Sequence, residues 1–439
     1  MTTQTNPPGS ATVENPVSAM RRIFRENRAG NPHGIYSVCS AHPLVLDAAF
    51  AQASADKSLL LIEATCNQVN QDGGYTGLTP SGFRDYVHSI AAGADYPLEQ
   101  LILGGDHLGP NPWRSQPAAT AMEKASVMVH AYALAGFAKI HLDASMRCAD
   151  DPTVLSDAEI AERAARLCEV AEDAAAHSSI RPVYIVGTEV PIPGGAQGEL
   201  EIDVTSIANV QKTLEVHRYA FERHGLSSAW ERVVGVVVQP GVEFGDEAIA
   251  DYIPRNAAEL SHWILSAEEI VFEAHSTDYQ MADSLRHLVR DHFAILKVGP
   301  ELTFVLRKAV FGLAHIEEEW ISDAGRSKIR AIFDRVMVED PGNWQSYYRG
   351  DAHQLRIARA YSLSDRIRYY WPNAEVSSAL SVLIENLLHH SAPLPLVAQY
   401  LPFQAEAIRR GEIANDPRAM IRHSVRQTLA RYSQACGLS

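Results

Sequence analysis

An aspartate and a histidine stand side by side where one apolar run of the sequence ends. Residues 101–107 read LILGGDH, so Asp106 and His107 follow a short strand-like segment. A carboxylate next to an imidazole fits a general acid or base beside a metal ligand. Adjacent strand residues point to opposite faces, so both can serve one site only where the backbone turns, which the neighbouring glycines permit. The alternative is a strand-end turn in which Asp106 caps the following amides.

Reactive side chains recur at the ends of other apolar runs. They are Ser40, His42, Glu63, His141, Asp143, Glu189, Gln239, Glu273, His275 and Lys297. His107, Glu189 and His275 end the third, fifth and seventh runs, and imidazole with carboxylate suits Zn²⁺ or a similar divalent ion. Three protein ligands leave a position open for a substrate oxygen, and His141 or Asp143 could complete or replace one of them. The alternative is a set of hydrogen-bonded residues on the rim of the fold.

Eight apolar runs are typical of buried strands. They lie at 34–40, 59–65, 101–107, 139–145, 183–189, 233–241, 270–276 and 293–299. Their hydrophobicity is continuous rather than alternating, which indicates a parallel sheet covered on both faces. Helix-like stretches separate most of them, and 156–178 opens with a capping signal. This alternation predicts a (β/α)8 barrel, which gathers its strand ends on one face, where barrel active sites are built.

The rest of the chain divides into a tail and a helical region. Residues 302–320 predict a closing helix, and apolar residues then recur at spacings of three and four to the end. We therefore expect a barrel over 16–320 and an all-helical region over 321–439. Residues 1–15 lack a basic start and an apolar stretch, so they read as a disordered tail rather than a signal peptide.

The composition argues against several classes of function. A net charge of -15 disfavours nucleic acid or an anionic membrane as the main partner, and no apolar run approaches a membrane span. The five cysteines are far apart and without a Cys-x-x-Cys motif, which fits reduced thiols in the cytoplasm. Neither an ATP-binding G-x-x-x-x-G-K-[ST] motif nor a dinucleotide fingerprint is present. A small-molecule substrate is therefore favoured.

Side-chain amides and cations suit a polar, phosphorylated substrate. The loop 67–80 is rich in amides that fit the hydroxyls of a polyol. Lys297 ends the eighth run, where barrels often bind phosphate, and Arg366 or Arg368 could reach a phosphate in its own or a neighbouring subunit. Glycines within 190–200 could also line an anion. A plain loop and helix surface are the ordinary alternatives. The residues expected to bind substrate are Glu63, Asn67, Gln68, Asn70, His141, Gln239, Lys297 and Arg366.

Nine segments carry a family resemblance. They read SVCSAHPLV, LIEATCNQVNQDGGYTG, GGDHLGPN, KIHLDASM, GTEVPIPGG, VVQPGVEF, EAHSTDYQ, HFAILKVGP and SLSDRIRYYWP. From about Pro16 to the C-terminus the chain resembles the GatZ/KbaZ family, the Z subunits associated with D-tagatose-1,6-bisphosphate aldolase. The resemblance implies a barrel related to class II aldolases, which use a divalent metal, usually zinc, on phosphorylated ketoses. In those enzymes an aspartate acts as acid or base just before a metal-binding histidine, as at Asp106 and His107, whereas Glu189 stands near the place of a further histidine.

Members of this family have been described as tagatose-6-phosphate kinases, as aldolase subunits without activity of their own and as sugar 4-epimerases. The missing ATP-binding motif makes the kinase the weakest expectation. The C4 hydrogen of a 2-ketose is not acidic, so inversion at C4 requires breaking the C3–C4 bond: a base takes the C4 hydroxyl proton, a metal stabilises the enediolate, and the aldehyde turns before it re-adds. Asp106, Asp143 and Glu189 are the expected acids and bases.

We therefore expect metal-dependent C4 epimerisation of D-tagatose 6-phosphate or a related ketose. The alternative is a non-catalytic subunit that stabilises the catalytic subunit of a class II aldolase. A homo-oligomer is compatible with either expectation.

Overall fold

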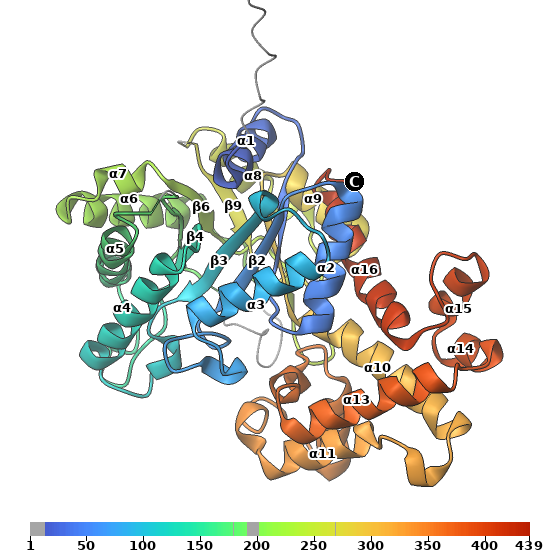
Figure 1. Cartoon of the computed structure of the whole chain (residues 1–439). Helices are drawn as coiled ribbons and strands as arrows, with labels where there is room; N and C mark the ends of the chain where they lie inside the picture. Colours follow the sequence, from blue (N-terminus) through green and yellow to red (C-terminus); the bar gives the residue numbers. More distant parts are fainter. Residues whose placement is uncertain (1–13, 179, 191–201, 268) are drawn as a thin grey trace, which may run out of the picture.

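Eight parallel strands form a closed barrel at the centre of the molecule (Figure 1). The computed structural model describes residues 14–178, 180–190, 202–267 and 269–439. The barrel strands are β1 (Ile35–Val38), β2 (Leu60–Thr65), β3 (Leu101–Leu108), β4 (Lys139–Leu142), β5 (Val183–Val186), β6 (Val233–Val237), β9 (Val271–Ala274) and β10 (Ile295–Val298). Strand β10 pairs in parallel with β1 and so closes the barrel. The predicted (β/α)8 barrel is confirmed, and each predicted strand overlaps an observed one.

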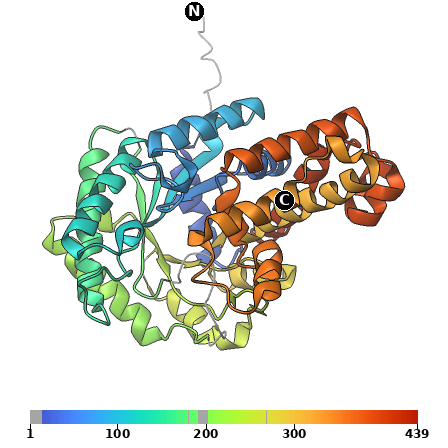
Figure 2. The same ribbon diagram turned by 90° about the horizontal axis from the view of Figure 1, so that it is seen from below.

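Helices cover the outside of the barrel (Figure 2). Those that follow the strands are α2 (Pro43–Asp56), α3 (Pro80–Gly93), α4 (Ala118–Leu134), α5 (Asp157–Ala174), α6 (Ile207–Arg223), α8 (Ala258–Ile264), α9 (Ala282–Arg290) and α10 (Pro300–Trp320). Ser156 and Glu159 form a capping box at the start of α5. Shorter elements in the connections are α7 (Ser227–Trp230), β7 (Glu243–Phe244) and β8 (Ile249–Ala250). Across the described ranges, every helix is too short or too polar to cross a membrane.

Helix α1 (Pro16–Arg28) closes the N-terminal end of the barrel. Its buried Met20 and Phe24 belong to one apolar cluster with strand residues such as Ile35 and Ile102. Burying these side chains stabilises the fold. Because α1 covers this end, the barrel interior is reached from the C-terminal ends of the strands. Of the tail expected over residues 1–15, the first thirteen lie outside the described residues, and Asn15 caps α1.

The C-terminal region is helical, as expected, but its last helix returns to the barrel. The region contains α11 (Ile329–Glu339), α12 (Ala352–Tyr361), the 3₁₀ helix η7 (Arg366–Tyr370), α13 (Ala374–His389), α14 (Leu394–Tyr400), α15 (Pro402–Arg409) and α16 (Pro417–Ala435). Figure 1 shows α16 beside α2. The hydroxyl of Tyr432 donates to Thr277 O at 2.7 Å. Thus α16 completes the helical shell, and α11 to α15 extend to one side.

His217, a buried histidine of α6, makes stability depend on pH. Its Nδ1 donates to Thr213 O at 2.8 Å, and burial lowers its pKa to about 4. The unfolded chain binds a proton below about pH 6.5 that the folded chain excludes, so this contribution to stability is lost as the pH falls from 6.5 to 4. We expect His217→Leu to reduce the fall in unfolding free energy over this window by roughly 2–3 kcal/mol, measured by urea denaturation. An unchanged pH dependence would contradict this prediction.

Candidate metal centre

Three histidines meet at the C-terminal end of the barrel. His107 lies on β3, His141 on β4, and His275 directly follows β9. The ring centroid of His107 lies 5.1 Å from that of His141 and 4.8 Å from that of His275, and the remaining distance is 5.2 Å. All three side chains are buried. The structure therefore brings together imidazoles that are far apart in the sequence.

Each imidazole is paired with a carboxylate through one ring nitrogen. The three pairs are His107 Nδ1–Asp143 Oδ2 at 2.8 Å, His141 Nδ1–Asp106 Oδ1 at 3.0 Å and His275 Nε2–Glu273 Oε1 at 2.9 Å. Carboxylate–imidazole pairs of this kind fix the orientation and the tautomer of metal-binding histidines. The second nitrogen of each ring remains for a ligand. For His107, Nε2 lies 3.8 Å from Asp106 Oδ2, beyond hydrogen-bonding distance.

Two of the three histidines belong to a group of donor residues that could hold a divalent metal ion. One ligand atom from each of Asp106, His141, Glu273 and His275 lies within 4.8 Å of the others. The Nε2 atom of His141 is buried and has no hydrogen-bond partner, an arrangement that is unfavourable unless a ligand satisfies it. Imidazole and carboxylate donors suit divalent transition metals.

The charges buried around the histidines also favour a bound cation. Two lysines, Lys139 and Lys297, lie among four carboxylates, Glu63, Asp106, Asp143 and Glu273. Lys139 Nζ lies 2.6 Å from Glu63 Oε1 and 2.7 Å from Glu273 Oε2. Lys297 Nζ contacts Glu63 and lies 2.8 Å from Asp106 Oδ1. The four carboxylates outnumber the two lysines by two. Burial opposes protonation of His107, but Asp106 and Asp143 outweigh it and raise its pKa, so His107 offsets one of these charges and a bound cation would offset the other.

The protonation states of the carboxyl groups and of His275 also suit metal binding. Burial opposes ionisation of Asp106, but the charges of His107 and Lys297 outweigh it and hold its pKa well below the ordinary value. Burial likewise opposes ionisation of Asp143, and its hydrogen bond with His107 lowers the pKa to about 2. Burial lowers the pKa of His275 to about 4. At neutral pH both carboxyl groups are ionised and His275 is neutral, the form that binds metals.

A bulge in β3 lets Asp106 and His107 serve one site. His107 has a φ of 50°, in the left-handed region, and the pairing with β4 shifts register between Gly105 and Leu108. Bulges of this kind redirect side chains that a regular strand would place on opposite faces.

Gly109 leaves room for the backbone that carries Asp143. A Cβ at this position would lie 1.6 Å from Asp143 O, a clash that no side-chain rotation can relieve. We expect Gly109→Ala to lower the unfolding free energy by about 2 kcal/mol or more and to weaken metal binding by displacing Asp143. Gly93→Ala in α3 is the matched control, because its Cβ meets nothing within 4 Å and should be neutral or slightly stabilising. Equal urea midpoints for the two variants would contradict the prediction.

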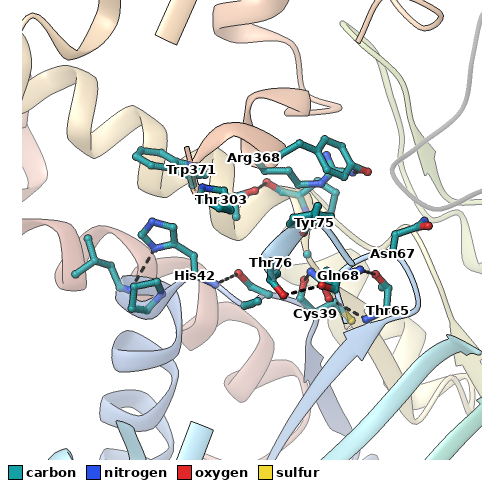
Figure 3. Close-up of a pocket in the computed structure, with 18 of the residues that line it drawn as sticks. Cys39, His42, Thr65, Asn67, Gln68, Tyr75, Thr76, Thr303, Arg368 and Trp371 are labelled. Atoms are coloured by element: carbon teal, nitrogen blue, oxygen red, sulfur yellow. Dashed lines mark hydrogen bonds between the residues drawn. The ribbon is translucent and has the colours of Figure 1, made fainter. Parts of the chain in front are cut away.

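A pocket of about 600 Å³ extends from the histidines to the C-terminal helical region. Its floor includes Asp106, His107, His275 and Lys297. The loop after β2 contributes Asn67, Gln68, Tyr75 and Thr76, and the C-terminal region contributes Arg368, Tyr369 and Trp371. Figure 3 shows Arg368 and Tyr75 on one side of the pocket and His42 and Trp371 on the other. The C-terminal region therefore forms part of the site.

The structure does not bring Glu189, an expected metal ligand and catalytic residue, to the histidines. Its carboxylate is exposed and accepts hydrogen bonds from Thr205 Oγ1 and Asn209 Nδ2, each at 2.6 Å. Strand β5 ends at Val186, so the chain has already left the barrel rim at Glu189. Apart from Val190, the anion loop expected over 190–200 lies outside the described residues.

Five of the eight expected substrate residues lie in the pocket wall or directly beneath it. Asn67, Gln68 and Lys297 line the pocket, whereas Glu63 and His141 belong to the buried network of ion pairs and hydrogen bonds beneath it.

Asn70, Gln239 and Arg366 do not line the pocket. The side-chain oxygens of Asn70 and Gln239 each accept two backbone N–H groups of their own loops. The guanidinium carbon of Arg366 lies 3.2 Å from the ring centroid of Tyr347. These three side chains shape their own segments, and the structure gives no support for placing substrate on them.

Lys139 received no role from the sequence, and Glu273 received none beyond its place at the end of an apolar run. Lys139 precedes His141 by two positions, and Glu273 precedes His275 by two. Strand residues two apart share a face, so each pair points to the same side of the barrel wall. This spacing is the signal that could have identified Lys139 as a member of the site and Glu273 as the partner of His275.

The fold and the cluster define a (β/α)8 barrel with a buried imidazole–carboxylate centre at its C-terminal mouth. The profile of the D-tagatose-1,6-bisphosphate aldolase subunit GatZ/KbaZ-like family matches residues 20–437. The chain belongs to this family, which confirms the resemblance of its sequence segments.

Solved structures provide one close comparison and two distant ones. The crystal structure of a probable tagatose 6 phosphate kinase from Sinorhizobium meliloti 1021 is 49% identical, with a TM-score of 0.85, and the match covers 92% of this chain and 100% of that one. The YdjI aldolase from Escherichia coli K12 has 13% identity and a TM-score of 0.40, covering 85% of this chain and 96% of that one. The fructose-bisphosphate aldolase from Campylobacter jejuni has 14% identity and a TM-score of 0.40, covering 83% and 91%.

Proposed function

We propose that this protein is a metal-dependent 4-epimerase of D-tagatose 6-phosphate or a closely related ketose, acting in carbohydrate catabolism. The observation that supports it best is the triangle of three imidazoles, each paired with a carboxylate, at the open end of the barrel. Breaking and re-forming C3–C4 requires a Lewis acid, a base and a pocket that retains the aldehyde. The cluster and the pocket above it can provide these three elements.

The metal would be held by His107, His141 and His275, through the ring nitrogens that make no hydrogen bond to a carboxylate. Of these three residues, His141 and His275 belong to the group whose ligand atoms lie within 4.8 Å of one another. Zn²⁺ is the expected ion, because three imidazoles with an open position form a common catalytic zinc site. When bound, it would supply stabilisation of the negative charge that develops on the ketose oxygens as C3–C4 breaks.

Asp106 is the residue we assign as the base. Its carboxylate is ionised, lies in the pocket floor and is held by His141 and Lys297. It would take the C4 hydroxyl proton while the C3–C4 electron pair moves to C3, leaving C4 as an aldehyde and C1–C3 as an enediolate. After the aldehyde turns, attack of C3 on its other face inverts C4, and Asp106 returns the proton to the new hydroxyl. Asp143 would position His107, because its second oxygen accepts from Ser145.

Direct conversion of D-tagatose 6-phosphate to D-fructose 6-phosphate tests the proposal. The purified protein, loaded in turn with Zn²⁺, Mn²⁺ or Mg²⁺, should produce fructose 6-phosphate without any other protein present. Absence of product with all three ions would overturn the assignment.

The second candidate is a subunit that stabilises a separate class II aldolase subunit. The family description, which names an aldolase subunit, is the observation that favours it. This function predicts no turnover alone and a rise in the activity of a co-expressed aldolase subunit. The kinase function in the description of the Sinorhizobium meliloti protein has less support, because this sequence contains no G-x-x-x-x-G-K-[ST] motif.

A further inference from the structure

Three cationic side chains line the pocket besides its histidines, namely Lys297, Arg368 and Arg418. Lys297 lies at the floor, and its charge is already balanced by Glu63 and Asp106. Arg418 is exposed near the start of α16, where water and salt screen its charge. Arg368 is half-buried and, among the described residues, has no carboxylate within ion-pair distance of its guanidinium. It is therefore the pocket cation most available to an anionic ligand.

Arg368 also keeps hydrogen-bond donors free. Its Nη1 donates to Ser364 O at 2.5 Å and to Asp365 O at 3.1 Å, and its Nη2 donates to the hydroxyl of Tyr369 at 3.0 Å. A guanidinium has five N–H groups, so these contacts leave two of them. The planar fork of N–H donors matches the oxygens of a phosphate group.

The segment that carries Arg368 is fixed to the barrel. The hydroxyl of Thr303 on α10 donates to Asp365 Oδ2 at 2.6 Å, and the hydroxyl of Tyr279 donates to Leu363 O at 2.6 Å. Arg368 is thus held in place before a ligand arrives, which reduces the entropy lost on binding.

Ring and backbone contacts connect Arg368 to the loop after β2, which lines the pocket. The Tyr369 ring lies 4.8 Å from the Tyr75 ring, edge to face, and Tyr75 N donates to Asn67 O at 3.0 Å. In the same loop, Gln68 Nε2 donates to Cys39 O at 3.3 Å. Figure 3 shows Arg368 and Tyr75 together above this loop.

We propose that Arg368 binds the terminal phosphate of the ketose, so that the C-terminal helical region supplies the anion site of the pocket. This inference rests on the proposed function for the identity of the sugar. Of the three cations that the sequence offered for the phosphate, Lys297, Arg366 and Arg368, it selects Arg368.

Calorimetric binding of two sugars to the zinc-loaded protein tests this assignment by affinity, a measurement that does not rely on the rate of epimerisation. The probes are D-tagatose 6-phosphate and D-tagatose, each titrated into the original protein and into Arg368→Met. The original protein should prefer the phosphorylated sugar. Arg368→Met should raise its Kd for that sugar about 10- to 100-fold, the range for hydrogen bonds to a charged group, and change the Kd for D-tagatose less than about 3-fold.

Two further variants keep the result specific. Arg418→Met removes the same charge from the outer rim of the same pocket and should change neither Kd by more than about 3-fold. Arg368→Lys keeps the charge and loses the fork, so it should lose only part of the preference for phosphate. Equal weakening of both sugars by Arg368→Met, or no preference for the phosphorylated sugar in the original protein, overturns the inference. If the preference depends on Arg368 but no epimerisation occurs, the proposed function fails and the phosphate site stands.

Discussion

His275→Ala should lose its bound divalent metal and, with it, all measurable epimerase activity. His275 is one of the three imidazoles in the triangle, and Glu273 holds its Nε2, which leaves Nδ1 for the metal. Removing a group that only orients a metal ligand typically weakens binding 10- to 100-fold, so removal of a ligand should exceed about 100-fold. Metal content after dialysis, measured by mass spectrometry alongside turnover, checks the prediction.

Two variants show whether the loss is specific to the triangle. Asp143→Asn weakens the orientation of His107 without removing an imidazole, so its metal affinity should fall only about 10- to 100-fold. His42→Ala removes a histidine that lines the same pocket outside the triangle and should retain one metal per chain. Equimolar metal in dialysed His275→Ala would exclude His275 from the ligand set.

Lys139→Met should destabilise the protein by about 3–5 kcal/mol, the range for breaking a buried ion pair by removing one partner. The ammonium of Lys139 is 0% exposed and bridges Glu63 and Glu273, so its removal leaves two buried carboxylates with less compensation. Urea unfolding of the two proteins at pH 7 measures the difference.

Lys212→Met is the matched control for this loss of charge. Lys212 forms an ion pair with Asp157 at 2.6 Å, but its side chain is 64% exposed. Surface ion pairs contribute about 0–1 kcal/mol, so this variant should unfold near the midpoint of the original protein. Similar midpoints for Lys139→Met and Lys212→Met would show that the buried network contributes far less than its geometry indicates.

The barrel could be predicted from the sequence because the pattern that specifies each strand lies within a short stretch of residues. Continuous apolar runs mark strands that are covered on both faces, and those runs fixed the number and order of the strands. The return of α16 to the shell had no such signal, because its contacts with Thr277 and the barrel helices join segments far apart in the chain. Local periodicity identifies a helix but not its neighbours.

The site was predictable in its centre and less so at its edge. His107 and His275 meet as the strand-end positions predicted, whereas Glu189 lies three residues beyond the end of β5, a difference that hydrophobicity does not resolve. Arg366 and Arg368 present a similar limit. They lie two positions apart on a 3₁₀ helix with three residues per turn, so they point in different directions, and the sequence does not tell which one faces the pocket.

The nuclear magnetic resonance spectrum of D-tagatose 6-phosphate incubated with the zinc-loaded protein in heavy water tests the central claim most directly. Cleavage and re-formation of C3–C4 at the histidine triangle never removes the C4 hydrogen. The account therefore predicts fructose 6-phosphate that keeps hydrogen at C4. Fructose 6-phosphate carrying deuterium at C4, or no fructose 6-phosphate at all, would contradict it.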